Sequence, residues 1–208
     1  DSAERNLAVG GTALDAITTG DDNVGVGHNA LSANSTGPYN TAVGSGALES
    51  NTSGDGNVAY GYQALAANVE GRLNSGFGYR SLYSNTSGEA NVALGNAVLY
   101  SNQTGSLNTA IGNSSLYANT TGFANSMLGF EAGRSNTTGY RNTGVGYEVL
   151  ELNTIGYGNT AVGHLAMSTN TEGVYNTAMG VRELLNNSGN YNVAVGHEAI
   201  NANTTGYS

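Results

Sequence analysis

The sequence predicts an all-β protein, a parallel β-solenoid (β-roll) of twelve coils with 17 residues each. A pentad of Asn, a variable residue, a small residue, an apolar residue and Gly recurs every 17 residues from Asn6 onward, with one unit shortened to 16. A 17-residue unit is too short for the helix pairs of helical repeat proteins. The composition, with 32 Gly, one Pro and no G-X-Y period, also excludes collagen and polyproline rods.

One unit contains two candidate strands. We number its positions from 0, at the first Asn, to 16; Asn fills position 0 and Gly fills position 4 in all twelve units. We expect one strand over positions 0–4 and another around positions 7–11, separated by Gly and by an Asn-Thr-Thr-Gly turn. At about 4.8 Å per coil, twelve coils form a rod of about 55 Å. The repeats run through residues 6–208, so we expect residues 1–208 to form a single domain.

The apolar positions of the unit predict the core. Position 3 is apolar in every unit and position 8 is Leu in nine of them, so we expect both to point inward. On this interpretation an Asp in place of Ile111 buries a charge and costs several kcal/mol. Position 2 is Ala or Gly in eleven units. Such small residues indicate close packing against either the opposite wall of the coil or a neighbouring chain.

Asparagine and glycine have separate predicted roles. A second Asn fills position 11 in eleven units. We expect the amides at positions 0 and 11 to form ladders in which each coil donates to the next. Gly at positions 4 and 14 is expected where the backbone needs a positive φ or where coils approach closely. The shortened unit loses its residue near Asn187 and Gly189, in the turn.

The pentads resemble a motif of known fibrous proteins. Residues 40–44 (N-T-A-V-G) and 108–112 (N-T-A-I-G) are similar to the short motif in the heads of trimeric autotransporter adhesins, and to N-T-A-I-G repeats of bacterial and phage fibre proteins. The resemblance implies a parallel β-roll, assembly as a trimer and a location on the surface of a cell or virion.

Charge and composition exclude several partners and chemistries. The net charge is −9 with only six scattered basic residues, so no nucleic-acid partner is expected. No apolar run approaches the roughly 20 residues of a membrane span, so we expect no membrane insertion. The absence of Cys removes disulfides and thiolate metal sites.

The sequence does not predict an enzyme, a cofactor or a metal site. His28, His164 and His197 all lie at position 5, and even the last two are two coils apart, about 9.6 Å. Asp21 and Asp22 are a weak candidate for calcium, since a regular Asp ladder is missing. Ladders of like groups do not gather the unlike groups that catalysis needs.

Aromatic residues form the candidate ligand or partner surface. They gather at a few outward positions and should stack along the rod, with Arg134 placed for a cation–π contact at the end of one row. Three interpretations stay open: stabilisation of the ladder itself, packing against another chain, or a platform for sugars. The selected residues are Tyr83, Tyr100, Tyr117 and Arg134 at position 9, and Phe123, Tyr140 and Tyr157 at position 15.

These features predict a structural fibre or adhesin segment, extracellular or at a cell or virion surface. Its expected partner is itself, as a trimer or an end-to-end filament, because neither end of the sequence carries a unit that would cap the stack. Surface glycans are a second expected partner, bound through Tyr and Asn ladders. An ice-binding solenoid is a third alternative, because positions 1, 12 and 13 are rich in Thr.

Overall fold

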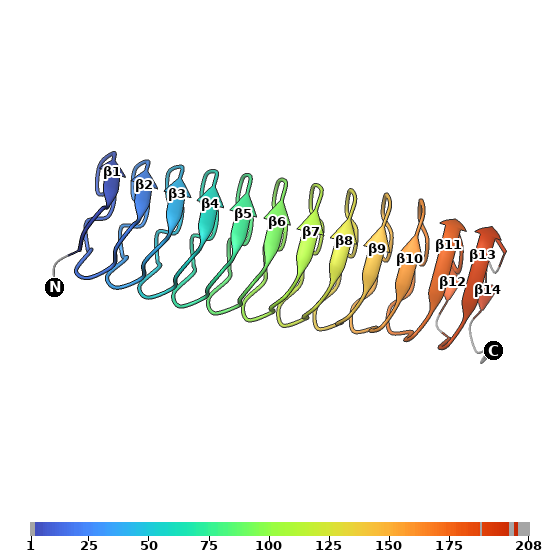
Figure 1. Ribbon diagram of the computed structural model, residues 1–208. Helices are drawn as coiled ribbons and strands as arrows, with labels where there is room; N and C mark the ends of the chain where they lie inside the picture. The colour runs from blue at the N-terminus through green and yellow to red at the C-terminus, as the bar shows by residue number, and fades with distance from the viewer. Residues whose placement is uncertain (1–2, 188, 200–201, 204–208) are drawn as a thin grey trace.

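The computed structural model describes residues 3–187, 189–199 and 202–203, and it shows a parallel β-solenoid whose coils follow one another along the rod (Figure 1). One strand of each coil joins a single twelve-stranded sheet in strict chain order, which confirms the predicted fold class. The strands are β1 (Leu7–Val9), β2 (Val24–Val26), β3 (Thr41–Val43), β4 (Val58–Tyr60), β5 (Ser75–Phe77), β6 (Val92–Leu94), β7 (Thr109–Ile111), β8 (Ser126–Leu128), β9 (Thr143–Val145), β10 (Thr160–Val162), β11 (Thr177–Val181) and β13 (Val193–His197).

The register of this sheet follows the repeat. Thr41 in β3 pairs with Val58 in β4, one unit of 17 residues later. Between β11 and β13 the step is 16, with Thr177 opposite Val193, so the shortened unit keeps its strand in register. A second, two-stranded sheet pairs β12 (Asn186–Asn187) with β14 (Ala202–Asn203).

The other wall of the coil differs from the prediction. Apart from β12 and β14, positions 7–11 of the described coils form consecutive turns instead of a second strand. The residues at positions 6 and 8 have positive φ, as Ser114 (55°) and Leu116 (50°) illustrate. Two left-handed residues separated by one position prevent an extended conformation. The predicted second strand is therefore wrong for most of the rod.

The core contains position 2 and not position 3, so the prediction that position 3 points inward is wrong. Strands β1 to β10 are each three residues long, and side chains alternate between the two faces of a strand. Ala110, in the middle of β7, is fully buried, whereas Tyr60 at position 3 is 59% exposed. A Cβ on Gly25 at position 2 would contact Leu14 from the opposite wall. Position 2 is small because the opposite wall of the same solenoid fills the narrow interior.

Position 8 is buried, as predicted. The leucines from this wall fill the interior together with small residues at position 7. Each large Leu faces small Ala or Gly residues of the sheet, and this pairing keeps the two walls close. The fully buried leucines of position 8 are Leu31, Leu48, Leu65, Leu82, Leu99, Leu116, Leu150 and Leu184.

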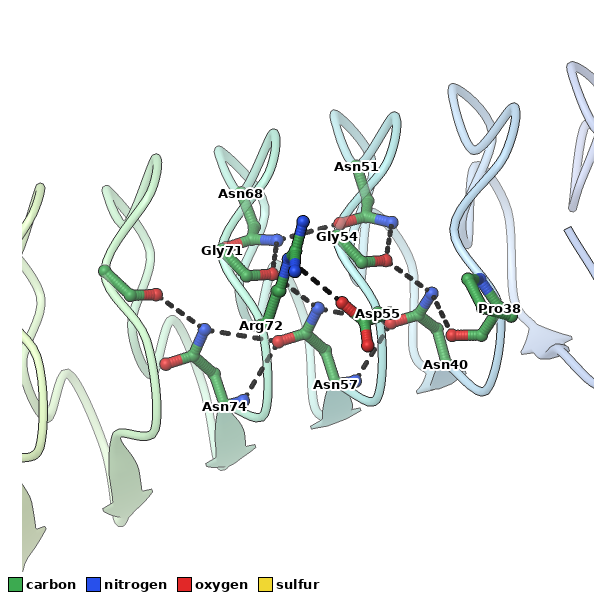
Figure 2. Close-up of polar contacts among 11 residues, drawn as sticks. Pro38, Asn40, Asn51, Gly54, Asp55, Asn57, Asn68, Gly71, Arg72 and Asn74 are labelled. Atoms are coloured by element: carbon green, nitrogen blue, oxygen red, sulfur yellow. Dashed lines mark hydrogen bonds and ion pairs between the residues drawn. The ribbon is translucent and has the colours of Figure 1, made fainter.

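The predicted asparagine ladder at position 11 is confirmed (Figure 2). The Nδ2 of Asn68 donates to the Oδ1 of Asn51 at 2.8 Å and to the carbonyl of Gly71 at 3.0 Å. The next coil repeats the pattern, since the Nδ2 of Asn85 donates to the Oδ1 of Asn68 at 2.8 Å. These amides are fully buried, so the ladder satisfies polar groups that would otherwise lack partners.

A second ladder runs through position 0. The backbone N–H of Asn57 donates to the Oδ1 of Asn40 at 2.9 Å, and its Nδ2 donates to the carbonyl of Gly71 at 2.8 Å. The carbonyl of Gly71 thus accepts from both asparagines of its coil, Asn57 and Asn68. The two ladders therefore fix the turn that joins one coil to the next (Figure 2).

Glycine at position 4 is required by both backbone angle and space. Gly112 has φ +118°, and a Cβ there would lie within 3.0 Å of the backbone of Gly129 in the next coil. No side chain of ordinary size fits such a site. Position 14 needs Gly for close approach, since a Cβ there would meet the carbonyl of the next position-14 Gly.

Candidate functional site

The position-9 tyrosines form a continuous ladder, as predicted. The ring centroids of Tyr83 and Tyr100 are 5.1 Å apart at 11°, and those of Tyr100 and Tyr117 are 5.1 Å apart at 7°. Coil spacing alone produces this geometry, because the same side chain recurs once per strand step. The offset stacking stabilises neighbouring coils against each other.

The position-15 residues form a second ladder. Phe123 and Tyr140 stack at 4.8 Å, and Tyr140 and Tyr157 at 4.6 Å. The row then turns, since Tyr175 meets Tyr157 edge-on at 5.2 Å. Desolvation by the surrounding protein raises the pKa of Tyr157, with the neighbouring tyrosines adding to the shift.

The predicted cation–π contact of Arg134 with this tyrosine row is not found among the described residues. The Nε of Arg134 lies 3.7 Å from a carboxylate oxygen of Glu131, three residues earlier, and forms an ion pair with it. Arg80 makes such contacts instead: its guanidinium carbon lies 5.2 Å from the Tyr79 centroid and 5.3 Å from that of Tyr83.

Stacking controls what these ladders present to solvent. Parallel rings about 5 Å apart are too close to lie side by side in one plane, so their faces turn toward one another. Along a ladder, each ring is largely covered by the next, and solvent meets ring edges and hydroxyl groups. At the Tyr83 end of the position-9 ladder, the guanidinium of Arg80 lies over the last ring.

The outer face of the twelve-stranded sheet is the surface that sequence reasoning missed. Positions 1 and 3 both point outward from it, and all the residues at these positions are uncharged. Several large apolar side chains are conspicuously exposed: Val9 52%, Leu94 48%, Met179 47% and Val195 65%. The signal was present in the sequence, because Tyr60 and Phe77 at position 3 are too large for a narrow interior.

Among the described residues, the histidines and acids considered as metal ligands lie apart from one another or contact other groups. Within the described part of the chain, no three His, Asp or Glu side chains are close enough to hold one metal ion. His164 stacks on Tyr147 at 5.3 Å. Asp22, a candidate for calcium, instead accepts from Arg5 at 2.6 and 2.9 Å, and this bond lowers the pKa of its carboxyl.

Carboxylates gather at one place on the turn wall. Glu131 and Glu148 lie at position 6 of adjacent coils, and Glu151 lies nearby at position 9. Partial burial raises the pKa of Glu151, and the negative charges of Glu148 and Glu131 raise it further. The three carboxylates therefore repel one another within the folded rod.

Comparison with known proteins leaves the resemblance of the pentads as a prediction. We found no match to this chain among protein-family models, curated proteins or solved structures. The described residues include no helix long and apolar enough to cross a membrane.

Proposed function

We propose that this chain is a self-associating structural segment of an extracellular fibre or adhesin, and that copies pack side by side through the outer face of the sheet. One observation carries the proposal: an uncharged, largely apolar strip, formed by positions 1 and 3, runs along the sheet. Exposed apolar strips of this length typically mark interaction surfaces. The extracellular location rests on the resemblance of the pentads.

The size of the strip suits a contact between copies. Eleven steps between twelve strands make a strip about 53 Å long and about 12 Å wide, on the order of 600 Å² per copy. A pair of such strips buries about 1,200 Å², at the lower end of stable interfaces. A trimer, in which each copy meets two others, adds further contact beside the strip.

The composition of the strip determines the kind of contact. The side chains of β7 and β8 that point outward are Thr109, Ile111, Ser126 and Leu128. Since none is charged, burial of apolar area supplies the driving force, and salt should change the association little. The 4.8 Å repeat gives identical rods matching rows of side chains, which favours a second copy as partner.

The contacts between successive coils support a mechanical role. Buried amide ladders and stacked rings connect every coil to the next along the rod. A force along the rod loads these contacts in every coil, because each unit contacts only its neighbours. Such an element provides length and stiffness to a fibre.

The alternatives receive less support from the geometry. A sugar platform along the ladders needs open ring faces, and the stacked rings cover one another. An ice-binding surface needs a flat array of similar small groups, and the strip holds Tyr60 and Phe77 next to valines. Thermal hysteresis of the purified protein tests the ice alternative directly.

Charge placed on the strip tests the proposal. In the double variant Ile111→Asp, Leu128→Asp, adjacent strands carry carboxylates that oppose burial against a second copy. We expect the wild type to form multi-copy species at micromolar concentration in mass photometry and sedimentation, and the variant to be a folded monomer. End-to-end stacking would survive the substitution, because the coil ends are unchanged.

A matched variant controls for added charge. Ser53→Asp, Thr121→Asp places the same charges on exposed turn residues away from the strip, and it should associate like the wild type. A wild type that stays monomeric, or an equal association of both double variants, would overturn the lateral contact.

A further inference from the structure

The two rows of side chains on the outward strip differ in height. Position 1, where each strand begins, holds only Ser, Thr and Val after Leu7 in the first unit. Position 3, two residues later, holds Val or a larger apolar side chain in every unit. Because each position pairs with the same position of the next coil, the two rows run straight along the rod. The strip is therefore low along its position-1 edge and high along its position-3 edge.

The difference in height is greatest in two coils. In β5 the outward side chains are Ser75 and Phe77, and in β8 they are Ser126 and Leu128. Phe77 and Leu128 are each 38% exposed. In both coils the smallest residue type of the strip thus lies two positions before a large, exposed one. Each of these coils therefore presents a protrusion beside a recess.

Two identical straight strips that overlap along their full length can face each other in two ways. A twofold axis along the rod makes the copies parallel and reverses the strand direction across the contact, so position 1 faces the partner's position 3 in the same coil. A twofold axis along the strands makes the copies antiparallel, and position 1 then faces position 1. In either case both copies use the same surface.

The difference in height favours the parallel arrangement. Packed sheets lie about 10 Å apart, and side chains from both fill the space between them. In the antiparallel pair the high rows would meet along one edge and the low rows along the other, which crowds the first edge and leaves voids at the second. In the parallel pair each high row meets a low row, so both edges are filled to a similar depth.

We propose that two copies pair through the strip with their rods parallel and in register, about a twofold axis that runs along the rod. This arrangement rests on the lateral contact proposed above. In it, Ser75 faces the partner's Phe77 along both edges of the contact. A shift by one coil would place Phe77 against Val92 on one edge and Val58 on the other, because these valines flank Ser75 in the sheet. The same residues therefore determine both the direction of the pair and its register.

Ser75→Phe tests the match in size, and the exchange Ser75→Phe, Phe77→Ser is its matched control. Both positions point outward, so both variants should keep the circular dichroism spectrum of the wild type. In the parallel pair Ser75→Phe sets two large rings against each other on both edges, and it should weaken association by about tenfold or more in sedimentation. The exchange again sets one large side chain against one small one, so it should associate like the wild type.

The antiparallel pair makes a different prediction for Ser75→Phe. There Ser75 would face Ser126 in the low rows, where a large ring fills a void. Unchanged association of Ser75→Phe, or an equal loss in both variants, would therefore overturn the proposed arrangement.

Spin labels test the direction of the pair independently. The chain has no Cys, so Ser53→Cys in the third coil and Thr104→Cys in the sixth each place one label per copy at position 13, away from the strip. In the parallel pair, the label-to-label distances from pulsed electron paramagnetic resonance should be equal for the two variants. In the antiparallel pair, the residue-53 labels would lie seven coils apart along the rod, about 34 Å, and the residue-104 labels one coil apart, about 5 Å.

The outcomes separate this arrangement from the proposed function. Clearly unequal distances in a protein that associates would overturn the parallel arrangement and leave the lateral contact intact. A wild type that stays monomeric would overturn both.

Discussion

Removal of one amide from the position-11 ladder should destabilise the whole rod. Asn68 is fully buried and takes part in three side-chain hydrogen bonds, with Asn51, Gly71 and Asn85. In Asn68→Ala all three are lost; Figure 2 shows the bonds of Asn68 with Asn51 and Gly71. Gly71 still accepts from Asn57, but the Oδ1 of Asn51 loses the Nδ2 donor of residue 68 and is buried without a partner.

The magnitude follows from these losses. Each hydrogen bond contributes about 1 kcal/mol net, and a buried acceptor left unsatisfied costs about 1–3 kcal/mol. We therefore expect Asn68→Ala to lower the free energy of unfolding by about 4–6 kcal/mol, a large share of the roughly 5–15 kcal/mol of a typical domain.

The assay is urea unfolding followed by circular dichroism, with Asn96→Ala as the control. Asn96 is exposed at position 5, and its side chain forms no hydrogen bond among the described residues, so its removal should change stability by less than about 0.5 kcal/mol. Similar unfolding midpoints for the two variants would refute the argument that the ladder stabilises the rod.

Three further substitutions test backbone and charge. Gly112→Val, at φ +118° against the next coil, should lower the melting temperature far more than Asn113→Val beside it. Leu107 is 63% exposed and has φ 61°, a backbone angle that Gly adopts without strain. Leu107→Gly should therefore stabilise the rod by up to about 1 kcal/mol in thermal unfolding. Leu152→Gly is the control: Leu152 has no positive φ, so this substitution should destabilise the rod. Because the pKa of Glu151 is raised in the folded state, protonation of this residue favours folding. The stability of the protein should therefore rise as the pH falls through the folded pKa of Glu151. Glu151→Gln should raise the melting temperature at pH 7 and weaken this pH dependence.

The aromatic rows show how far the candidate surface could be predicted. Stacking of Tyr83, Tyr100 and Tyr117 follows from spacing alone, because a residue repeated every 17 positions recurs at the strand step. The partner of Arg134 could not be predicted in this way, because its guanidinium forms an ion pair with Glu131 instead of a cation–π contact with the tyrosine row. The contact of Arg80 with Tyr83 also needed the structure, because it depends on the direction that the long Arg80 side chain takes.

The sequence by itself determined the solenoid, its period, the register of its strands, the amide ladders and the glycine positions. Each depends on identical residues meeting at one fixed spacing, which a repeat dictates locally. Only the tertiary structure decided which face of the strand is the inside. Position 2 and position 3 are both free of charge in every unit, and hydrophobicity alone favours position 3.

The deciding quantity was the width of the interior. Left-handed residues at positions 6 and 8 fold the second wall tightly, and its leucines occupy the space opposite the sheet. Only Ala, Gly or one Met fits against them at position 2, so the larger residues of position 3 point outward. Packing density across the interior, which no single unit of the sequence reveals, therefore overrides hydrophobicity.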